Sequence, residues 1–315
     1  MKKKNVILVA LMIMASLIAF NVSAGWLENI KNAISGKATQ NVDLNISVGI
    51  PQITLIINNS IDVSAGPSEA PAITTVVVNF SVYSPSGTGN LNDSTAAVNV
   101  TGDVERVNSS CLNYESSTTD VNYSCSIDLQ WWDGTGVWNI TAYIEDNQSN
   151  FATNSSADFY VGSRTAFVMG PSALTWNALS PGTYNQTSNN DPLVLNNTGN
   201  AVISTSGITI NSSNLRGETT PTEGLWAENF SVSWDTGGSS CTLDGCLECK
   251  GSAMSRGDFT AITGANLTKG NYTIDDKSTG QEELYMCLMY AGSELSTQSY
   301  STANETEWAW IVQIL

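Results

Sequence analysis

The feature that most constrains the fold is a two-residue alternation of apolar and polar side chains in short runs. In segment 137–144 (VWNITAYI), every second residue from Trp138 to Ile144 is apolar, and Asn139 and Thr141 lie between them. Successive side chains of a strand point to opposite faces, so this spacing predicts a strand with one buried face. Similar runs recur along the chain between clusters of Gly, Pro, Asn, Asp and Ser. The sequence therefore predicts an all-β fold built from sandwiches.

The runs form two series, with a break near Gly162–Arg164. We expect strands near 42–48, 53–58, 74–84, 95–101, 121–130, 137–145 and 157–161, and then near 166–169, 173–176, 192–195, 201–210, 229–234, 260–263, 271–275, 284–290 and 308–315. This predicts two tandem β-sandwich domains, 40–163 and 164–315, each of ordinary domain size.

The last run, 308–315, is apolar on both faces, which favours a central strand. At a sheet edge it could instead add to the sheet of a neighbouring subunit. The two positions therefore imply different functions for the end of the chain.

The N-terminus has the three parts of a secretory signal peptide. A basic start (MKKK) is followed by an apolar run from Val6 to Phe20 and by small residues before Gly25. The run is shorter than the roughly 20 residues that a membrane-spanning helix needs. We predict that residues 1–24 are cleaved after Ala24, the alternative being an uncleaved anchor. The mature chain is then expected to be secreted to the cell surface, without a transmembrane span.

Residues 25–39 follow the predicted cleavage site. Trp26, Leu27, Ile30 and Ile34 recur there at helical spacing, before Gly36. The segment is predicted to be a short amphipathic helix or a linker.

Charge and composition exclude several functions. The formal net charge is -17, and removal of Lys2, Lys3 and Lys4 would bring it to -20. Such a chain has no basic stripe for a phosphate backbone, so no nucleic-acid partner is expected. Histidine is absent, which removes Ser-His-Asp and Cys-His nucleophile systems and His-ligated zinc.

Many Asn-x-Ser/Thr motifs predict N-glycosylation. In strands such as 137–144 the acceptor Asn lies on the polar face, where a glycan would leave the core undisturbed. Plain alternation of polar and apolar residues is the competing explanation. The acceptors are Asn45, Asn58, Asn79, Asn92, Asn99, Asn108, Asn122, Asn139, Asn147, Asn154, Asn185, Asn196, Asn211, Asn229, Asn266, Asn271 and Asn304.

Two segments resemble extracellular β-modules. Gly136–Asn150 (GVWNITAYIEDNQSN) looks like a late strand and turn of Ig-like domains, and Asp191–Asn200 (DPLVLNNTGN) resembles a hairpin of CARDB-type modules. A signal peptide followed by Asn-rich β-modules is similar to secreted surface proteins common in archaea. The resemblance implies tandem Ig-like domains in a structural or adhesive surface protein, with no transferable catalytic residues.

Six cysteines in an exported chain suit three disulfides. Cys111 and Cys125 are alone in the first predicted domain and are expected to pair. In the second domain we favour Cys241–Cys287, with Cys246–Cys249 closing a small ring. The four cysteines could alternatively ligate zinc or act as a redox dithiol, although a second Cys-x-x-Cys is missing.

Other candidate sites are weak. Segment 83–94 has the outline of a calcium loop, but Asp93 is its only acid, and hard cations need several oxygen ligands. Asp133–Gly136 and Asp275–Asp276 are predicted to be turns. No local motif marks the carboxylate pair of a glycosidase. We therefore expect no catalytic, cofactor or metal site and no enzymatic activity.

Aromatic residues give one binding hint. Parity with Leu129 places Trp131 inward and Trp132 outward, and Tyr143 is also predicted to face outward. Exposed rings can stack on sugars or anchor protein contacts; a neighbouring loop could equally shield Trp132. The sequence thus favours a glycosylated structural or adhesive surface protein that contacts surface proteins, glycans or copies of itself. A carbohydrate-binding module and a filament subunit assembled by strand addition are the alternatives.

Overall fold

The computed structural model describes residues 49–58, 62–234, 241–242, 245–246, 251–305 and 309–314. Ile50–Leu315 group together as one compact unit. The predicted signal peptide, the 25–39 segment and the 42–48 strand lie outside the described residues. Within them, the fold is all-β, as predicted, and its sheets are antiparallel. The helical elements are short 3₁₀ turns: η1 (Thr88–Asn90), η2 (Ala227–Asn229), η3 (Tyr272–Ile274) and η4 (Thr302–Asn304).

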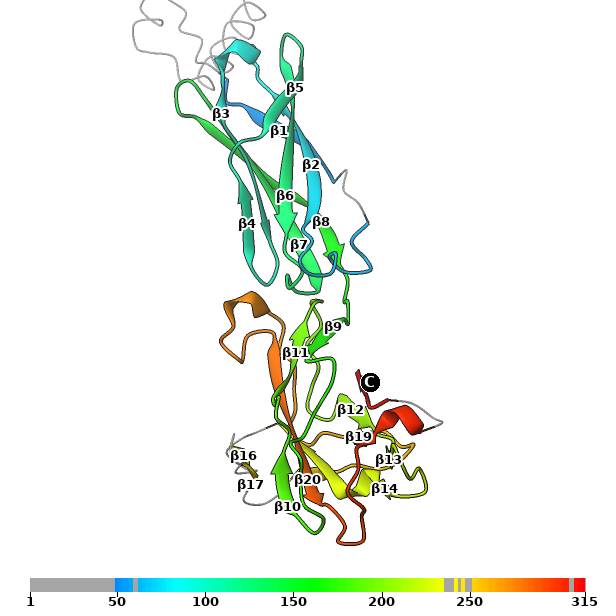
Figure 1. Cartoon of the computed structure of the whole chain (residues 1–315). Helices are drawn as coiled ribbons and strands as arrows, with labels where there is room; N and C mark the ends of the chain where they lie inside the picture. Colours follow the sequence, from blue (N-terminus) through cyan, green and yellow to red (C-terminus); the bar gives the residue numbers. More distant parts are fainter. Residues whose placement is uncertain are drawn as a thin grey trace, which may run out of the picture. The chain divides into compact units, whose positions relative to one another are not determined.

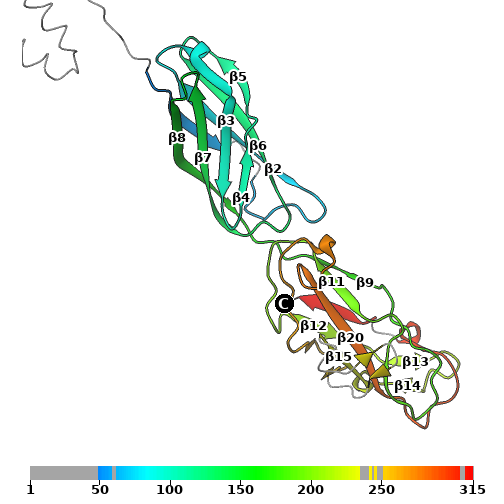
Figure 2. The ribbon, with the colours of Figure 1, turned by 90° about the vertical axis from the view of Figure 1, so that its left-hand side faces the viewer.

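Two four-stranded antiparallel sheets enclose the first core (Figure 1). One has the order β1-β2-β6-β5 and the other the order β4-β3-β7-β8. In Figure 2, β3, β7 and β8 lie side by side, as their pairing requires. The strands are β1 (Gln52–Asn58), β2 (Thr74–Tyr83), β3 (Leu91–Thr101), β4 (Glu105–Asn108), β5 (Leu112–Ser116), β6 (Asp120–Leu129), β7 (Gly136–Asp146) and β8 (Phe151–Val161).

In these sheets, the apolar residues of the alternating runs are buried and the residues between them are not. In β7, Trp138, Ile140, Ala142 and Ile144 are fully buried, and the residues between them lie on the outer face. The Trp138 ring fills the end of the core, and its indole Nε1 donates to the Gly134 carbonyl at 3.0 Å. Gly102 makes room for it, because a Cβ there would lie 2.3 Å from Trp138 Cε2.

The second part of the chain has one six-stranded sheet and three smaller sheets among the described residues. Their orders are β18-β15-β20-β11-β9 with β10 also on β20, β19-β12-β22, β14-β13-β21 and β16-β17. The strands are β9 (Phe167–Gly170), β10 (Tyr184–Thr187), β11 (Leu193–Asn197), β12 (Ile208–Asn211), β13 (Leu215–Gly217), β14 (Gly224–Leu225), β15 (Phe230–Ser233), β16 (Cys241–Thr242), β17 (Gly245–Cys246), β18 (Ser252–Ala253), β19 (Thr260–Ala261), β20 (Gln281–Tyr290), β21 (Tyr300–Ser301) and β22 (Ile311–Ile314). The central strand β20 reaches β10, β11 and β15. The domain boundary near 163 and the Ig-like topology stay predictions.

Two predicted strands are wrong. Segment 173–176 is a loop, because amide side chains bond the backbone groups that a strand would use: Asn190 Nδ2 donates to Ala173 O at 2.5 Å, and Asn190 Oδ1 accepts from Thr175 N at 3.0 Å. Segment 271–275 forms η3, because Asn271 caps its Thr273 N–H and Asp275 adopts a left-handed conformation.

The expected central position of the C-terminal strand is also wrong. β22 pairs with β12 at the edge of a three-stranded sheet. Val312 is buried, whereas Ile311 is 40% exposed. Apolarity on both faces therefore does not place this strand inside the sheet, since part of its apolar surface faces solvent.

The short edge strands β4 and β5 were not predicted from the sequence. All five residues of β5 are exposed, and β4 has no buried residue. An alternation signal requires one buried face, which neither strand has.

Asn200, the last residue of the NNTGN segment, is a buried hydrogen-bonding centre. Its Nδ2 donates to the carbonyls of Asp133 and Gly162, both at 2.9 Å, and its Oδ1 accepts from Arg164 N at 2.7 Å. The residue is only 3% exposed. Its side chain therefore satisfies three backbone groups that the sheets leave unpaired.

We expect Asn200→Ala to lower the free energy of unfolding by roughly 2–5 kcal/mol, because buried unpaired polar groups cost about 1–3 kcal/mol each. Denaturant unfolding of unglycosylated protein measures this change. The control Asn139→Ala, on the exposed face of β7, should change stability by less than about 0.5 kcal/mol. Equal effects of the two variants would contradict the role assigned to Asn200.

Candidate functional site

The first predicted disulfide is confirmed. Cys111 and Cys125 form a disulfide with a Cα–Cα distance of 4.5 Å, and both side chains are buried in the first core. Cys125 lies in β6 and Cys111 immediately precedes the neighbouring edge strand β5. The bond therefore fastens an exposed strand to a buried one.

Cys287, in β20, is also disulfide-bonded and 3% exposed. Its partner is not among the residues whose side chains the structure describes. Cys241 and Cys246 are register partners in the β16–β17 pair. The predicted pairing of Cys241 with Cys287 and of Cys246 with Cys249 stays a prediction.

The glycan acceptors differ in their access to solvent. Asn139, Asn147 and Asn304 are exposed, whereas Asn211 is buried at 4% exposure. A buried amide cannot carry a glycan in the folded protein, so Asn211 drops out as an acceptor there. Asn45 and the side chain of Asn58 lie outside the described residues. The half-buried acceptors are Asn79, Asn92, Asn99, Asn108, Asn122, Asn154, Asn185, Asn196, Asn229, Asn266 and Asn271.

Several of these amides already donate hydrogen bonds. Asn108 Nδ2 donates to Ser126 O at 2.7 Å, and Asn154 Nδ2 donates to Ile53 O at 3.0 Å. Asn139, the fourth residue of β7, makes no side-chain hydrogen bond within the described part of the chain. Among the strand acceptors whose side chains the structure describes, it alone is exposed.

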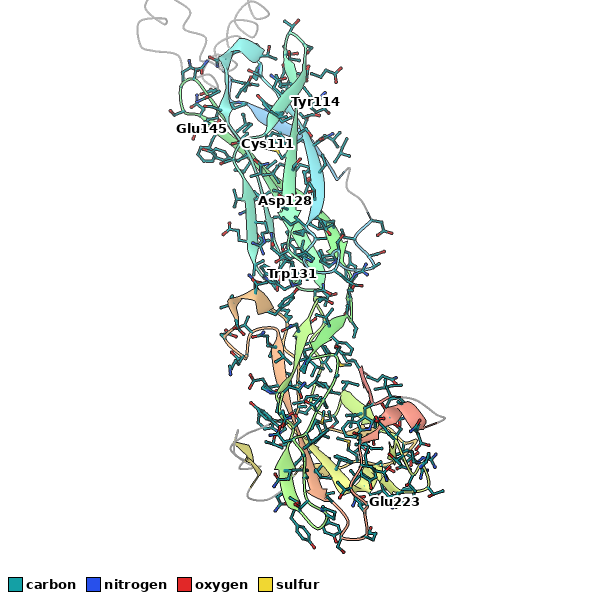
Figure 3. The ribbon with its side chains drawn as sticks, in the orientation of Figure 1. Cys111, Tyr114, Asp128, Trp131, Glu145 and Glu223 are labelled. Atoms are coloured by element: carbon teal, nitrogen blue, oxygen red, sulfur yellow. A yellow bond between two sulfur atoms is a disulfide. The ribbon has the colours of Figure 1, made fainter. Side chains whose placement is uncertain are left out.

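Trp132 and Tyr143 do not form one binding surface. Trp132 precedes β7 and Tyr143 lies seven residues after its first residue, Gly136, so about 23 Å of strand separates Tyr143 from that end at roughly 3.3 Å per residue. Figure 3 shows Trp131 and Glu145, neighbours of the two residues, at opposite ends of these sheets. The two residues are therefore not neighbours, and contact with a carbohydrate at either ring stays a prediction.

Each of the two rings also has a partner of its own. The half-buried Trp132 ring packs edge-on against buried Trp131, with centroids 4.3 Å apart. The outward-facing Tyr143 ring stacks on exposed Phe151, with centroids 5.9 Å apart, and its hydroxyl donates to Glu145. Phe151 therefore adds an exposed ring that sequence analysis did not select.

A cavity of about 740 Å³ reaches the second core. Its wall includes the fully buried core residues Phe230 and Met286, and also the loop 171–181 and the segment 295–302. Loop residues such as Asn177 and Ala178 are exposed, so the cavity lies next to the surface. Volumes of roughly 300–1,000 Å³ are typical of small-molecule sites.

Three aromatic rings in the wall lie against one another. The centroids of Trp176 and Phe230 are 5.4 Å apart, those of Phe230 and Trp310 are 5.0 Å apart, and those of Trp176 and Trp310 are 6.2 Å apart. The indole N–H of Trp176 donates to Gln186 O at 3.2 Å, and that of Trp310 donates to Ser213 O at 2.9 Å. The rings therefore offer the cavity apolar surface, with both indole donors already used.

The loop that carries Trp176 is held by the polar segment after β10. Asn177 N donates to Asn189 Oδ1 at 3.1 Å, and Asn189 N donates to Thr175 O at 2.7 Å. These bonds fix the loop across the core without a β-ladder. Sequence analysis missed the cavity because it interpreted the alternation around Trp176 as a strand; the flanking Pro171 and Pro181 were the available signal for a loop.

Two acidic groups in the described part of the chain, Asp133 and Asp93, are held in structural contacts. Buried Asp133 forms an ion pair with Arg106, whose Nε donates to it at 3.0 Å. Tyr123 donates its hydroxyl to Asp93 at 2.5 Å, and burial and this bond raise the pKa of Tyr123 far above its usual value. Among the described residues, no three His, Cys, Asp or Glu side chains gather as metal ligands. No helix in the same part of the chain is long and apolar enough to cross a membrane.

Comparisons with family models, curated proteins and solved structures give no match to this chain.

We expect the double substitution Cys111→Ser/Cys125→Ser to reduce the free energy of unfolding by about 3 kcal/mol, because it opens a loop of about 15 residues. Chemical denaturation of the otherwise oxidised protein tests this. Ser126→Ala, an exposed substitution in the same strand, is the control. Loss of less than about 1 kcal/mol would mean that the disulfide does not constrain the unfolded chain.

Proposed function

We propose that the protein is a secreted, N-glycosylated structural or adhesive component of the cell surface, without catalytic activity. The observation that carries this proposal is the distribution of acceptor asparagines outside a disulfide-fastened β-core. Asn139 is exposed beside the fully buried Trp138 and Ile140, so a glycan could be attached there without loss of packing. A disulfide in the same core suits an oxidising exterior.

Charge supports the same proposal. A formal charge of -17 favours solubility and discourages non-specific association at a crowded surface. Asp133 forms an ion pair with Arg106, and the Asn200 side chain forms hydrogen bonds to backbone groups. Because these polar groups have protein partners, they support a rigid structure. Such groups stabilise a scaffold and leave little for chemistry.

A filament subunit is a second candidate function, favoured by the edge position of β22. Its described backbone pairs on one side with β12, and exposed Ile311 lies on this edge strand. An unprotected edge can accept a strand from another copy. The proposed occupant is a strand of a second molecule of this protein.

Glycopeptide mapping of native protein tests the first proposal. We expect a glycan on Asn139 and none on Asn211, because only the former is accessible in the folded protein. Thr141→Ala destroys the Asn139 acceptor motif while keeping Asn139, and should remove one glycan from the intact mass; Asn211→Gln should leave the mass of the glycans unchanged. Native protein with an unmodified Asn139 and free Cys111 and Cys125 would refute a secreted glycoprotein.

Strand addition is tested by size-exclusion chromatography and electron microscopy of concentrated protein. Ile311→Lys should suppress assembly by at least tenfold, because a charge on an edge strand opposes pairing. Val107→Lys, on the edge strand β4, is the matched control and should assemble normally. Monomers at all concentrations in the unsubstituted protein would exclude this function.

A further inference from the structure

The cavity in the second core has no structural explanation within the proposed scaffold function. Protein interiors are normally packed to the density of organic crystals, with few voids larger than a water molecule. Here about 740 Å³ lies against side chains that belong to the core itself, including Leu193, Leu288 and Val312. Core residues at the wall of a large cavity lose packing contacts that a bound molecule would restore.

The chemistry of the wall indicates an uncharged occupant. None of the described residues that line the cavity is Asp, Glu, Lys or Arg, although the chain as a whole is strongly acidic. Burying an ionised group without a partner is very costly. A ligand with a charge inside the cavity would find no counter-ion there.

Two polar side chains of the wall, Gln298 and Tyr300, already have protein partners. Gln298 Oε1 accepts from Thr219 N at 2.9 Å and from Thr220 N at 2.7 Å, and its Nε2 donates to Glu223 at 3.0 Å. The Tyr300 hydroxyl donates to Ser296 O at 2.9 Å. With the indole N–H groups of the tryptophans also paired, the wall offers mainly apolar contact.

Apolar cavities of this kind favour organic ligands over water. A water molecule needs two to four polar partners, and apolar cavities in proteins stay dry and bind apolar molecules. The ring cluster of Trp176, Phe230 and Trp310 supplies flat surfaces at several orientations. Such surfaces contact hydrocarbon chains or fused rings over a large area.

We propose that the cavity between loop 171–181, segment 295–302 and the second core is a binding site for a neutral, predominantly apolar small molecule, such as the hydrocarbon part of a lipid. Loop 171–181 is the entrance, because it joins exposed residues to the Trp176 ring. None of the acceptor asparagines lines the cavity, so its test uses unglycosylated protein.

Fluorescence titration with the neutral apolar probe N-phenyl-1-naphthylamine tests the site. We expect saturable binding to one site with energy transfer from tryptophan. The melting temperature should rise by roughly 5–10 °C at a probe concentration of 100 times the Kd. Hexadecanol should displace the probe. The anionic analogue 1-anilinonaphthalene-8-sulfonate should bind at least tenfold more weakly, because the described wall residues include no cation. Equal affinity would overturn the assignment of a neutral ligand.

Matched variants test whether the probe binds in the cavity. Leu174→Glu places a charge in the half-buried wall and should weaken binding at least tenfold, whereas Leu112→Glu on exposed β5 should not change it. If Leu174→Glu fails to fold, Ala178→Trp is the second variant, because it narrows the exposed entrance and should also weaken binding. Its control is Ala72→Trp, at an exposed position outside the wall. Circular dichroism of each variant verifies folding. Absence of saturable binding, or equal binding by a folded wall variant and its control, would overturn the proposal.

Discussion

Burial of one face of each strand is the constraint on which the rest of the structure depends. In β7, four alternate residues from Trp138 to Ile144 are fully buried, and the intervening positions are free to be polar. The same geometry therefore fixes the core and presents Asn139 and Tyr143 on the outer face. The proposed glycosylated surface is a consequence of how the core is made.

The two cores differ in how closely their side chains are packed. In the first, the sheets are long, and Trp138 is enclosed closely enough that Gly102 has no space for a Cβ. In the second, many strands have two to four residues, and loop 171–181 forms part of the wall. Short strands leave space that loops must close, and here that space is a cavity rather than packed side chains.

Some strands and one disulfide could be predicted from the sequence, whereas other elements could not. The strands around Val76–Val82 and Trp138–Ile144 were predicted because they have one buried face, and the Cys111–Cys125 bond followed from their isolation in the first series of runs. Strand β5 could not be predicted, since all its residues are exposed. Segment 173–176 was misassigned because its backbone groups bond to the Asn190 side chain and to the backbone N–H of Asn189, which are distant enough to leave no local pattern.

By itself the sequence determined the class of fold and the inward and outward faces of the long strands, because these depend on local alternation. It also determined the Cys111–Cys125 disulfide, because each of these cysteines has only the other as a possible partner in the first series of runs. Tertiary structure decided the edge position of β22, the burial of Asn211, the separation of Trp132 from Tyr143 and the cavity beside Trp176. Each of these depends on which distant segments meet. Such meetings are set by the packing of the whole chain, and no local spacing of residues encodes them.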